Sequence, residues 1–228
     1  MCFSAEASFT AGAVLCIAGV FTVRKAANPS QKYFAAIPFI FAIQQITEGF
    51  VWLSFVSPAI AAWQVQATYF FLFFAQVFWP SWVPFALIMF EKDKKTKQLL
   101  IPFLIVGVFI SVYLTYILFN YEVTPEIRKY HMYYNIHHPF KTRAFSGLIY
   151  LIPTVLSTMV SKTKGIWLFG LLNFMAWVVS KMFFNDHVLS VWCFLAAWIS
   201  VIIYLILRSN SSSRLTISAN RLKYTEDR

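Results

Sequence analysis

Long apolar segments separated by short polar loops run along the whole chain. A membrane-spanning helix needs about 20 mainly apolar residues, because each residue adds roughly 1.5 Å and the hydrocarbon core is about 30 Å thick. The segments of this kind are 5–23, 33–55, 67–90, 99–119, 144–160, 166–184 and 188–207. The pattern therefore predicts an all-α fold, a polytopic membrane bundle of seven transmembrane helices.

Proline interrupts several of these segments, at Pro38, Pro80, Pro84 and Pro153. In a soluble helix an internal proline breaks the hydrogen-bond ladder. In a membrane bundle, neighbouring helices can satisfy the carbonyls that proline leaves unpaired. We therefore interpret these positions as kinks within spanning helices.

Domain organisation follows from the same pattern. The spanning segments and their short loops fill residues 1–208, which leaves no room for a soluble module. Residues 209–228 are rich in serine and charge and have no apolar face, so we expect a disordered cytoplasmic tail.

The composition indicates a membrane protein, and the distribution of the positive charge argues against nucleic-acid binding. Hydrophobic residues make up 59% of the chain and charged residues 12%, whereas soluble domains average about 45–50% and 25%. The net charge of +10 resides mainly in short loops and the tail. That distribution is typical of membrane proteins, so we expect the lipid bilayer as a partner and no nucleic acid.

The basic residues also predict the orientation. The first, third and fifth loops and the tail carry 14 Lys and Arg residues, and the second, fourth and sixth loops carry 4. Lys and Arg concentrate on the cytoplasmic side of membrane proteins. The N-terminus is therefore predicted to lie outside and the C-terminus in the cytoplasm. The fourth loop, 120–143, is predicted to be a polar interfacial loop with aromatic residues.

Polar residues within a membrane are costly and mark candidate functional positions. The densest group, Gln44, Gln45 and Glu48, lies in the second segment. Glu48 follows Tyr33 by about 15 residues, roughly 22 Å along a helix, which places it in the outer half of the bilayer. Two interpretations stay open: a functional carboxylate, or a structural one tied to a neighbouring helix.

A second group of polar residues surrounds the last loop. Lys181 either extends to the interface or pairs with Glu48 or Asp186, because a lone buried ammonium is expensive. Asp186 is also a candidate N-cap of the last segment. His187 is a candidate proton carrier and shares a helix face with Ser190.

Together these residues predict a polar pocket in the outer leaflet. Glu48 would be its central acceptor or proton carrier and Lys181 the counter-charge, and a kink near Pro80 would open a cavity beside Gln76. The predicted lining is Glu6, Gln44, Gln45, Glu48, Gln76, Lys181, Asp186, His187 and Ser190. We expect no bound metal and no cofactor, since no compact His-x-x-x-His or Cys-x-x-Cys spacing occurs.

The function that this pocket indicates is binding or translocation of a small or lipidic ligand. One alternative is a membrane-embedded hydrolase that uses the same pocket. Another is a sensory or structural membrane protein without a ligand or catalysis. The ligand, the enzymatic status and the oligomeric state stay open at this point.

Three stretches resemble a family of uncharacterised, mainly bacterial multi-pass membrane proteins. They are the opening Met1-Cys2-Phe3-Ser4-Ala5, the run from Gln44 to Trp52 and the run from Ser190 to Ala197. The resemblance implies a multi-pass protein of the bacterial inner membrane. In layout alone, the seven spans with an outer N-terminus are also similar to alkaline ceramidase-like membrane hydrolases, which implies the hydrolase alternative.

Overall fold

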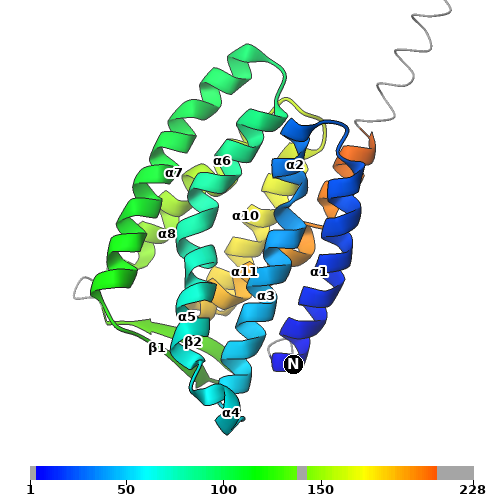
Figure 1. Ribbon diagram of the computed structural model, residues 1–228. Helices are drawn as coiled ribbons and strands as arrows, with labels where there is room; N and C mark the ends of the chain where they lie inside the picture. The colour runs from blue at the N-terminus through cyan, green and yellow to red at the C-terminus, as the bar shows by residue number, and fades with distance from the viewer. Residues whose placement is uncertain (1–3, 138–142, 210–228) are drawn as a thin grey trace, which may run out of the picture.

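The computed structural model describes residues 4–137 and 143–209 and shows an elongated helical bundle (Figure 1). The α-helices are α1 Ala5–Lys25, α2 Pro29–Ala35, α3 Ile37–Ser54, α4 Pro58–Ala61, α5 Gln64–Leu72, α6 Trp79–Phe90, α7 Lys94–Asn120, α8 Arg143–Leu151, α9 Ser157–Val160, α10 Ile166–Phe183 and α11 Val188–Ile199. Two π-helical segments, η1 Phe73–Phe78 and η2 Ile152–Leu156, connect α5 to α6 and α8 to α9, and a 3-10 turn, η3 Asn185–His187, precedes α11.

Six helical stretches in the described part of the chain are long and apolar enough to cross a membrane. They are Ala5–Lys25, Pro29–Ser54, Gln64–Phe90, Lys94–Asn120, Ile166–Phe183 and Asn185–Ser209. The predicted fifth segment, 144–160, coincides with α8, η2 and α9, whose apolar part is the shorter stretch Gly147–Val160. The predicted all-α class is confirmed, with six candidate spans among the described residues where the sequence predicts seven.

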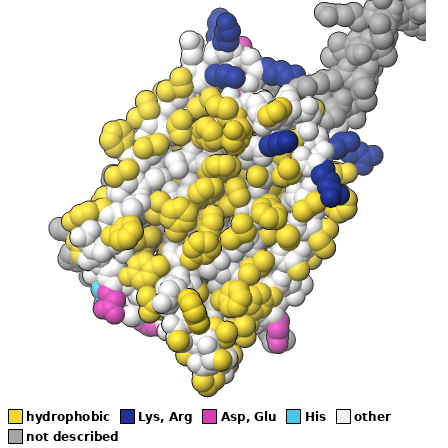
Figure 2. Space-filling model, in the orientation of Figure 1, with side chains coloured by type: hydrophobic (Ala, Val, Ile, Leu, Met, Phe, Trp, Pro, Cys, Tyr) yellow, Lys and Arg dark blue, Asp and Glu magenta, His cyan; other side chains and the backbone are white. Residues whose placement is uncertain are grey.

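The two ends of the bundle differ in charge. The N-terminus, α4 and the β-strands lie at one end, and the loop between α6 and α7 lies at the other (Figure 1). Figure 2 shows Lys and Arg gathered at the α6–α7 end and acidic side chains at the opposite end, with apolar side chains covering the face between them. An apolar belt between two polar ends is the surface that a bilayer requires.

The predicted polar loop 120–143 contains a β-hairpin. Strands β1, Val123–Arg128, and β2, His131–Ile136, pair antiparallel, with Arg128 opposite His131. The two residues between them, Lys129 and Tyr130, have φ angles of 47° and 65°. Two positive φ angles in a two-residue connection are the geometry of a type I′ turn, whose twist suits a hairpin.

This hairpin covers one end of the bundle and packs into it. Met132 and Tyr134, two residues apart in β2, point to the same side of the strand and are buried. The Tyr134 ring stacks on Phe71 of α5, with the ring centroids 5.0 Å apart. We call the segment Val123–Ile136 the hairpin cap.

The kinks predicted at Pro80 and Pro84 occur in a continuous span. Proline lacks an amide hydrogen, so each residue four positions earlier loses its usual helical donor. Neighbouring helices supply donors close by: Tyr150 Oη donates to the Ala75 carbonyl at 2.8 Å, and Ser111 Oγ donates to the Val77 carbonyl at 2.6 Å. The π-helical segment η1 is therefore held by side chains from α8 and α7.

Helix α7 comes very close to this kink at Gly107. A Cβ atom on Gly107 would lie 2.0 Å from the Pro80 carbonyl oxygen and 2.7 Å from its carbon. Pro84, which cannot donate to that oxygen, leaves space that α7 fills. Glycine is thus required where the two backbones meet.

We expect Gly107→Ala to lower the stability of the bundle, by about 1–3 kcal/mol, because the added methyl group forces α7 away from α6. Gly147→Ala in α8 is the matched control, since its Cβ would meet nothing within 4 Å. Unfolding midpoints in detergent measure both variants. Equal midpoints for the two alanine variants would contradict the close packing of α6 and α7.

Candidate functional site

The most deeply buried carboxylate among the described residues is Glu48, on α3. Gln44 and Glu48 are four residues apart and share the helix face that points into the bundle. The Glu48 side chain is 1% exposed. Ser190 Oγ, at the start of α11, donates a hydrogen bond of 2.5 Å to Glu48 Oε1. The carboxylate thus joins the second span to the last one.

Two more polar side chains face the same carboxylate. Gln45, the preceding neighbour on α3, and Tyr134, from the hairpin cap, interact with Glu48. Neither contact has ordinary hydrogen-bond geometry. Burial raises the pKa of Tyr134 well above its usual range, and the charge of Glu48 adds to the shift. The Tyr134 phenol therefore stays protonated and keeps a proton to donate.

Gln44 links this group to α6 and α11. Trp79 Nε1 donates a hydrogen bond of 2.8 Å to Gln44 Oε1, and the Cys193 thiol lies beside Gln44 and Glu48. We define the Glu48 cluster as Gln44, Gln45, Glu48, Tyr134 and Ser190.

Several buried atoms in and next to the Glu48 cluster have no hydrogen-bond partner. These atoms are Gln44 Nε2, Gln45 Nε2, Gln45 Oε1, Tyr134 Oη and, one turn further along α3, Trp52 Nε1. Leaving one buried polar group unpaired costs about 1–3 kcal/mol, so such groups are rare and call for an explanation. Their concentration around one carboxylate indicates a place prepared for polar partners.

A cavity of about 40 Å³ adjoins the cluster. Its lining is mainly apolar and includes Phe41, Trp79, Tyr150, Phe169, Trp192 and Cys193. Trp79 and Cys193 belong to the cavity wall and also contact Gln44, so the cavity and the cluster share a boundary. A water needs about 10–15 Å³ by this measure, so the cavity has room for roughly three water-sized groups.

The predicted pocket residues fall into two sets. The structure brings Gln44, Gln45, Glu48 and Ser190 together in the Glu48 cluster. Gln76 is half-buried in η1, and its Oε1 atom is buried without a partner. Glu6, in the first turn of α1, is exposed.

The residues around the last loop lie differently from the predicted arrangement. Lys181 is half-buried at the end of α10, and Asp186 is exposed in η3. The ion pairs among the described residues do not join Lys181 to Glu48 or to Asp186. Asp186 is not an N-cap, because α11 starts after the 3-10 turn with no side-chain cap.

His187 lies at the seam between the last span and the hairpin cap. Its Nδ1 atom is 3.3 Å from the Met132 carbonyl oxygen, and its ring stacks on His131 with the centroids 5.1 Å apart. Tyr133 meets the same ring edge-on. His187 therefore positions the cap that carries Tyr134. No group of three or more His, Cys, Asp or Glu side chains with metal-site geometry occurs within 4–137 and 143–209.

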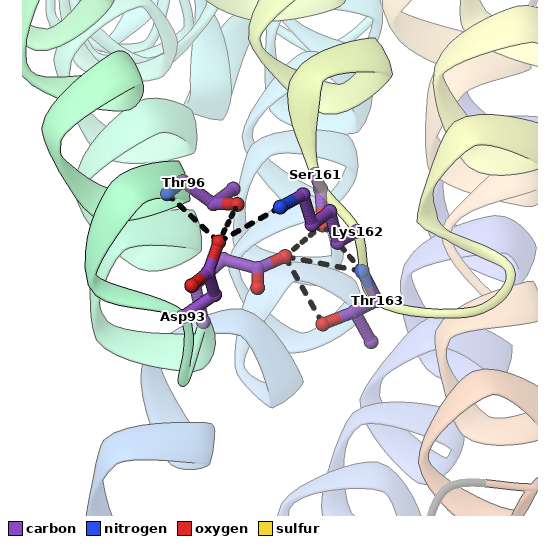
Figure 3. A network of polar contacts seen from close by, with 6 residues as sticks. Asp93, Thr96, Ser161, Lys162 and Thr163 are labelled. Atoms are coloured by element: carbon purple, nitrogen blue, oxygen red, sulfur yellow. Dashed lines mark hydrogen bonds and ion pairs between the residues drawn. The ribbon is translucent and has the colours of Figure 1, made fainter.

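A second polar network lies at the α6–α7 end (Figure 3). Buried Glu91 accepts hydrogen bonds from the hydroxyls of Ser161 and Thr163, and Asp93 accepts one from Lys162 Nζ at 3.0 Å. Hydrogen bonds from Thr96 and then Lys162 lower the pKa of Asp93 to about 2. Glu91 and Asp93 both accept hydrogen bonds from side chains of the α9–α10 loop, so this network fastens the α6–α7 loop to that loop.

Sequence patterns missed three residues of the site: Tyr134, Trp79 and Cys193. Met132, Tyr133 and Tyr134 are all buried in β2, so the strand has no period-two alternation that could have indicated the hairpin. No local pattern indicates that Trp79 reaches Gln44, because the contact joins helices 35 residues apart in sequence.

These features define an apolar multi-helix bundle, compatible with a multi-pass membrane protein, whose helices surround a buried polar cluster. A family model described as a family of unknown function (DUF6629) matches residues 1–218, and the chain belongs to that family. No curated protein and no solved structure matches the chain.

We expect Ser190 and Glu48 to stabilise the bundle jointly. Ser190→Ala removes the donor and Glu48→Ala the acceptor of the same buried hydrogen bond, so the double variant should lose less stability than the sum of the single losses. We expect a coupling energy of about 1–3 kcal/mol, measured by unfolding in SDS. The control pair is Ser190→Ala with Glu122→Gln, an exposed carboxylate before β1, whose effects should add.

Proposed function

We propose that this protein binds or translocates a small or lipidic ligand through the cavity beside the Glu48 cluster. The observation that carries the proposal is the group of buried, unpartnered polar atoms next to a mainly apolar cavity. Ligand sites are mostly apolar concavities with a few convergent polar groups. Glu48 is the central acceptor of this pocket.

Helix irregularities support the same proposal. Thr154 and Val155 of η2 line the cavity, and Trp79 follows directly after η1. π-Helical segments are rare and occur frequently at functional sites. Gln76 in η1 belongs to the proposed pocket as a polar group in such a segment, while Lys181, Asp186, His187 and Glu6 are proposed for its outer rim.

The topology that we propose has seven crossings, an outer N-terminus and a cytoplasmic C-terminus, in the inner membrane of a bacterium. The basic α6–α7 end in Figure 2 supports this orientation, because Lys and Arg favour the cytoplasmic side. The hairpin cap then lies outside. Helices α8 and α9, with η2 between them, form the fifth of the seven proposed crossings.

Reporter fusions test the topology. A phosphatase that is active only outside the inner membrane should be inactive when fused after Lys95 or at the C-terminus, and active when inserted at Tyr130 in the exposed hairpin turn. Phosphatase activity from the Lys95 fusion would reverse the orientation. Activity from the C-terminal fusion alone would indicate an even number of crossings.

Organic extraction of the purified full chain tests ligand binding. Mass spectrometry of the extract should find a small molecule or lipid enriched over the surrounding membrane. Glu48→Gln should reduce the enrichment about tenfold, because it replaces one oxygen of the central acceptor with an amide donor. His187→Gln should reduce it less, since His187 contacts the hairpin cap. Equal enrichment from wild type and Glu48→Gln would refute a pocket centred on Glu48.

A further inference from the structure

We infer that the hairpin cap is an acid-opened gate over the Glu48 cluster, and that protonation of His187 against His131 opens it. The inference concerns how the proposed binding site is regulated, so it rests on the proposed function for what the gate admits. Its basis is the contact between residues 131–133 of the cap and residues 184–187 of the bundle, which we call the seam. The position of the seam, its paired imidazoles and the charges around them carry the argument.

Strand β2 connects the seam to the Glu48 cluster. His187 Nδ1 lies 3.3 Å from the carbonyl oxygen of Met132, whose side chain is buried. Tyr134, two residues further along β2, is buried and interacts with Glu48. Because Met132 and Tyr134 belong to one short strand, a cap that leaves the seam also draws Tyr134 away from Glu48.

The seam is built around two stacked imidazole rings. The ring of His131, from the cap, lies on the ring of His187 with the centroids 5.1 Å apart. Phe184, at the end of α10, meets the His131 ring at 5.0 Å, and Tyr133 meets the His187 ring edge-on. His187 is only 8% exposed. Neutral imidazoles suit this packing, whereas two protonated rings at this distance repel each other.

The surroundings of His187 disfavour a positive charge on its ring. Burial has the largest effect, because water is withdrawn from the imidazolium. His131 and Arg128, both from the cap, add positive charge beside it. The Arg128 guanidinium lies over the Tyr133 ring, 3.8 Å from its centroid, so it is held close to the seam. Lys181, in the last turn of α10, is a further basic residue of the bundle side.

Three groups act in the opposite direction and are weaker than burial. The Met132 carbonyl accepts a hydrogen bond from either form of the ring, and Asp186 attracts a positive charge. Asp186 is exposed, so solvent screens its charge. Glu126 pairs with Arg128 at 2.6 Å and offsets part of the guanidinium charge. The first turn of α11 adds no titratable side chain.

A fall in pH therefore shifts the cap toward its undocked form. In the docked cap the His187 imidazolium is buried next to like charge, whereas in the undocked cap water solvates it. An imidazole ordinarily takes up its proton near pH 6.5, so the docked cap is favoured above that pH and is weakened below it. In the proposed topology the cap lies outside, so the gate responds to the external pH.

Hydrogen exchange of the full chain in lipid nanodiscs tests the gate, with mass spectrometry of the segment Val123–Ile136. Measured rates are divided by the intrinsic chemical rate at each pH, so that only protection is compared. A two-stranded hairpin alone is marginally stable, so an undocked cap should lose its protection. In wild type this segment should be at least about tenfold less protected at about pH 5.5 than at about pH 7.5, while α7 is unchanged.

Histidine variants assign the effect to the seam. His187→Gln keeps a donor for the Met132 carbonyl but takes up no proton, so the ratio of protection between the two pH values should fall to about one. His131→Gln should reduce the ratio, because one of the two stacked charges is lost. His137→Gln is the matched control, since His137 is exposed beside the cap and contacts Thr124, and it should keep the wild-type ratio.

Two results would overturn the gate. One is equal protection of the wild-type cap at both pH values. The other is an acid-induced loss that persists in His187→Gln, which is the pattern expected if His187 only packs against the cap. The wild-type ratio decides the inference even if His187→Gln fails to fold, and His131→Gln then tests the seam.

The outcomes also separate the gate from the proposed function. A cap that opens with acid, in a chain from which no enriched species is extracted, would keep the gate and refute the proposed binding. An enriched species that depends on Glu48, in a chain whose cap ignores pH, would keep the pocket and refute the gate.

Discussion

Every backbone carbonyl inside a bilayer needs a donor from the protein, and this constraint explains the middle of the structure. Pro80, Pro84 and Pro153 each remove a helical donor from a segment surrounded by apolar residues. Tyr150, Ser111 and Ser157 donate to nearby carbonyls, and Gly107 brings α7 against the Pro80 oxygen. Hydrogen bonds from Tyr150 and Ser111, together with the close approach at Gly107, therefore fix α6, α7 and α8 to one another beside the prolines.

The same hydrogen bonds to the irregular helix shape the candidate site. Tyr150 donates a hydrogen bond to the Ala75 carbonyl of η1 and also lines the cavity, so one residue both stabilises η1 and forms part of the cavity wall. Trp79 stands at the junction of η1 and α6 and donates to Gln44. Irregular helices, the cavity and the buried carboxylate are consequently parts of one arrangement, closed at one end by the hairpin cap.

The sequence predicted most of this architecture because hydrophobic length is a local property. The apolar segments, the kinks and the polar group on α3 are all visible in runs of about 20 residues. The sequence did not predict the hairpin, because its turn, Lys129–Tyr130, lacks the Asn-Gly pair that usually marks a type I′ turn. Lys181 was assigned to Glu48 on charge alone, whereas the contact that exists is from Ser190, a neutral residue.

The long separation between Glu48 and Ser190 has a consequence for biosynthesis. The serine follows the carboxylate by 142 residues, which takes roughly 7–28 s to translate at 5–20 residues per second. During that interval α3 is already synthesised, with its two glutamines and its glutamate, and the hairpin cap and α11 do not yet exist. The nascent chain must therefore shelter these polar groups, against α1 or within the insertion machinery, until its final helix arrives.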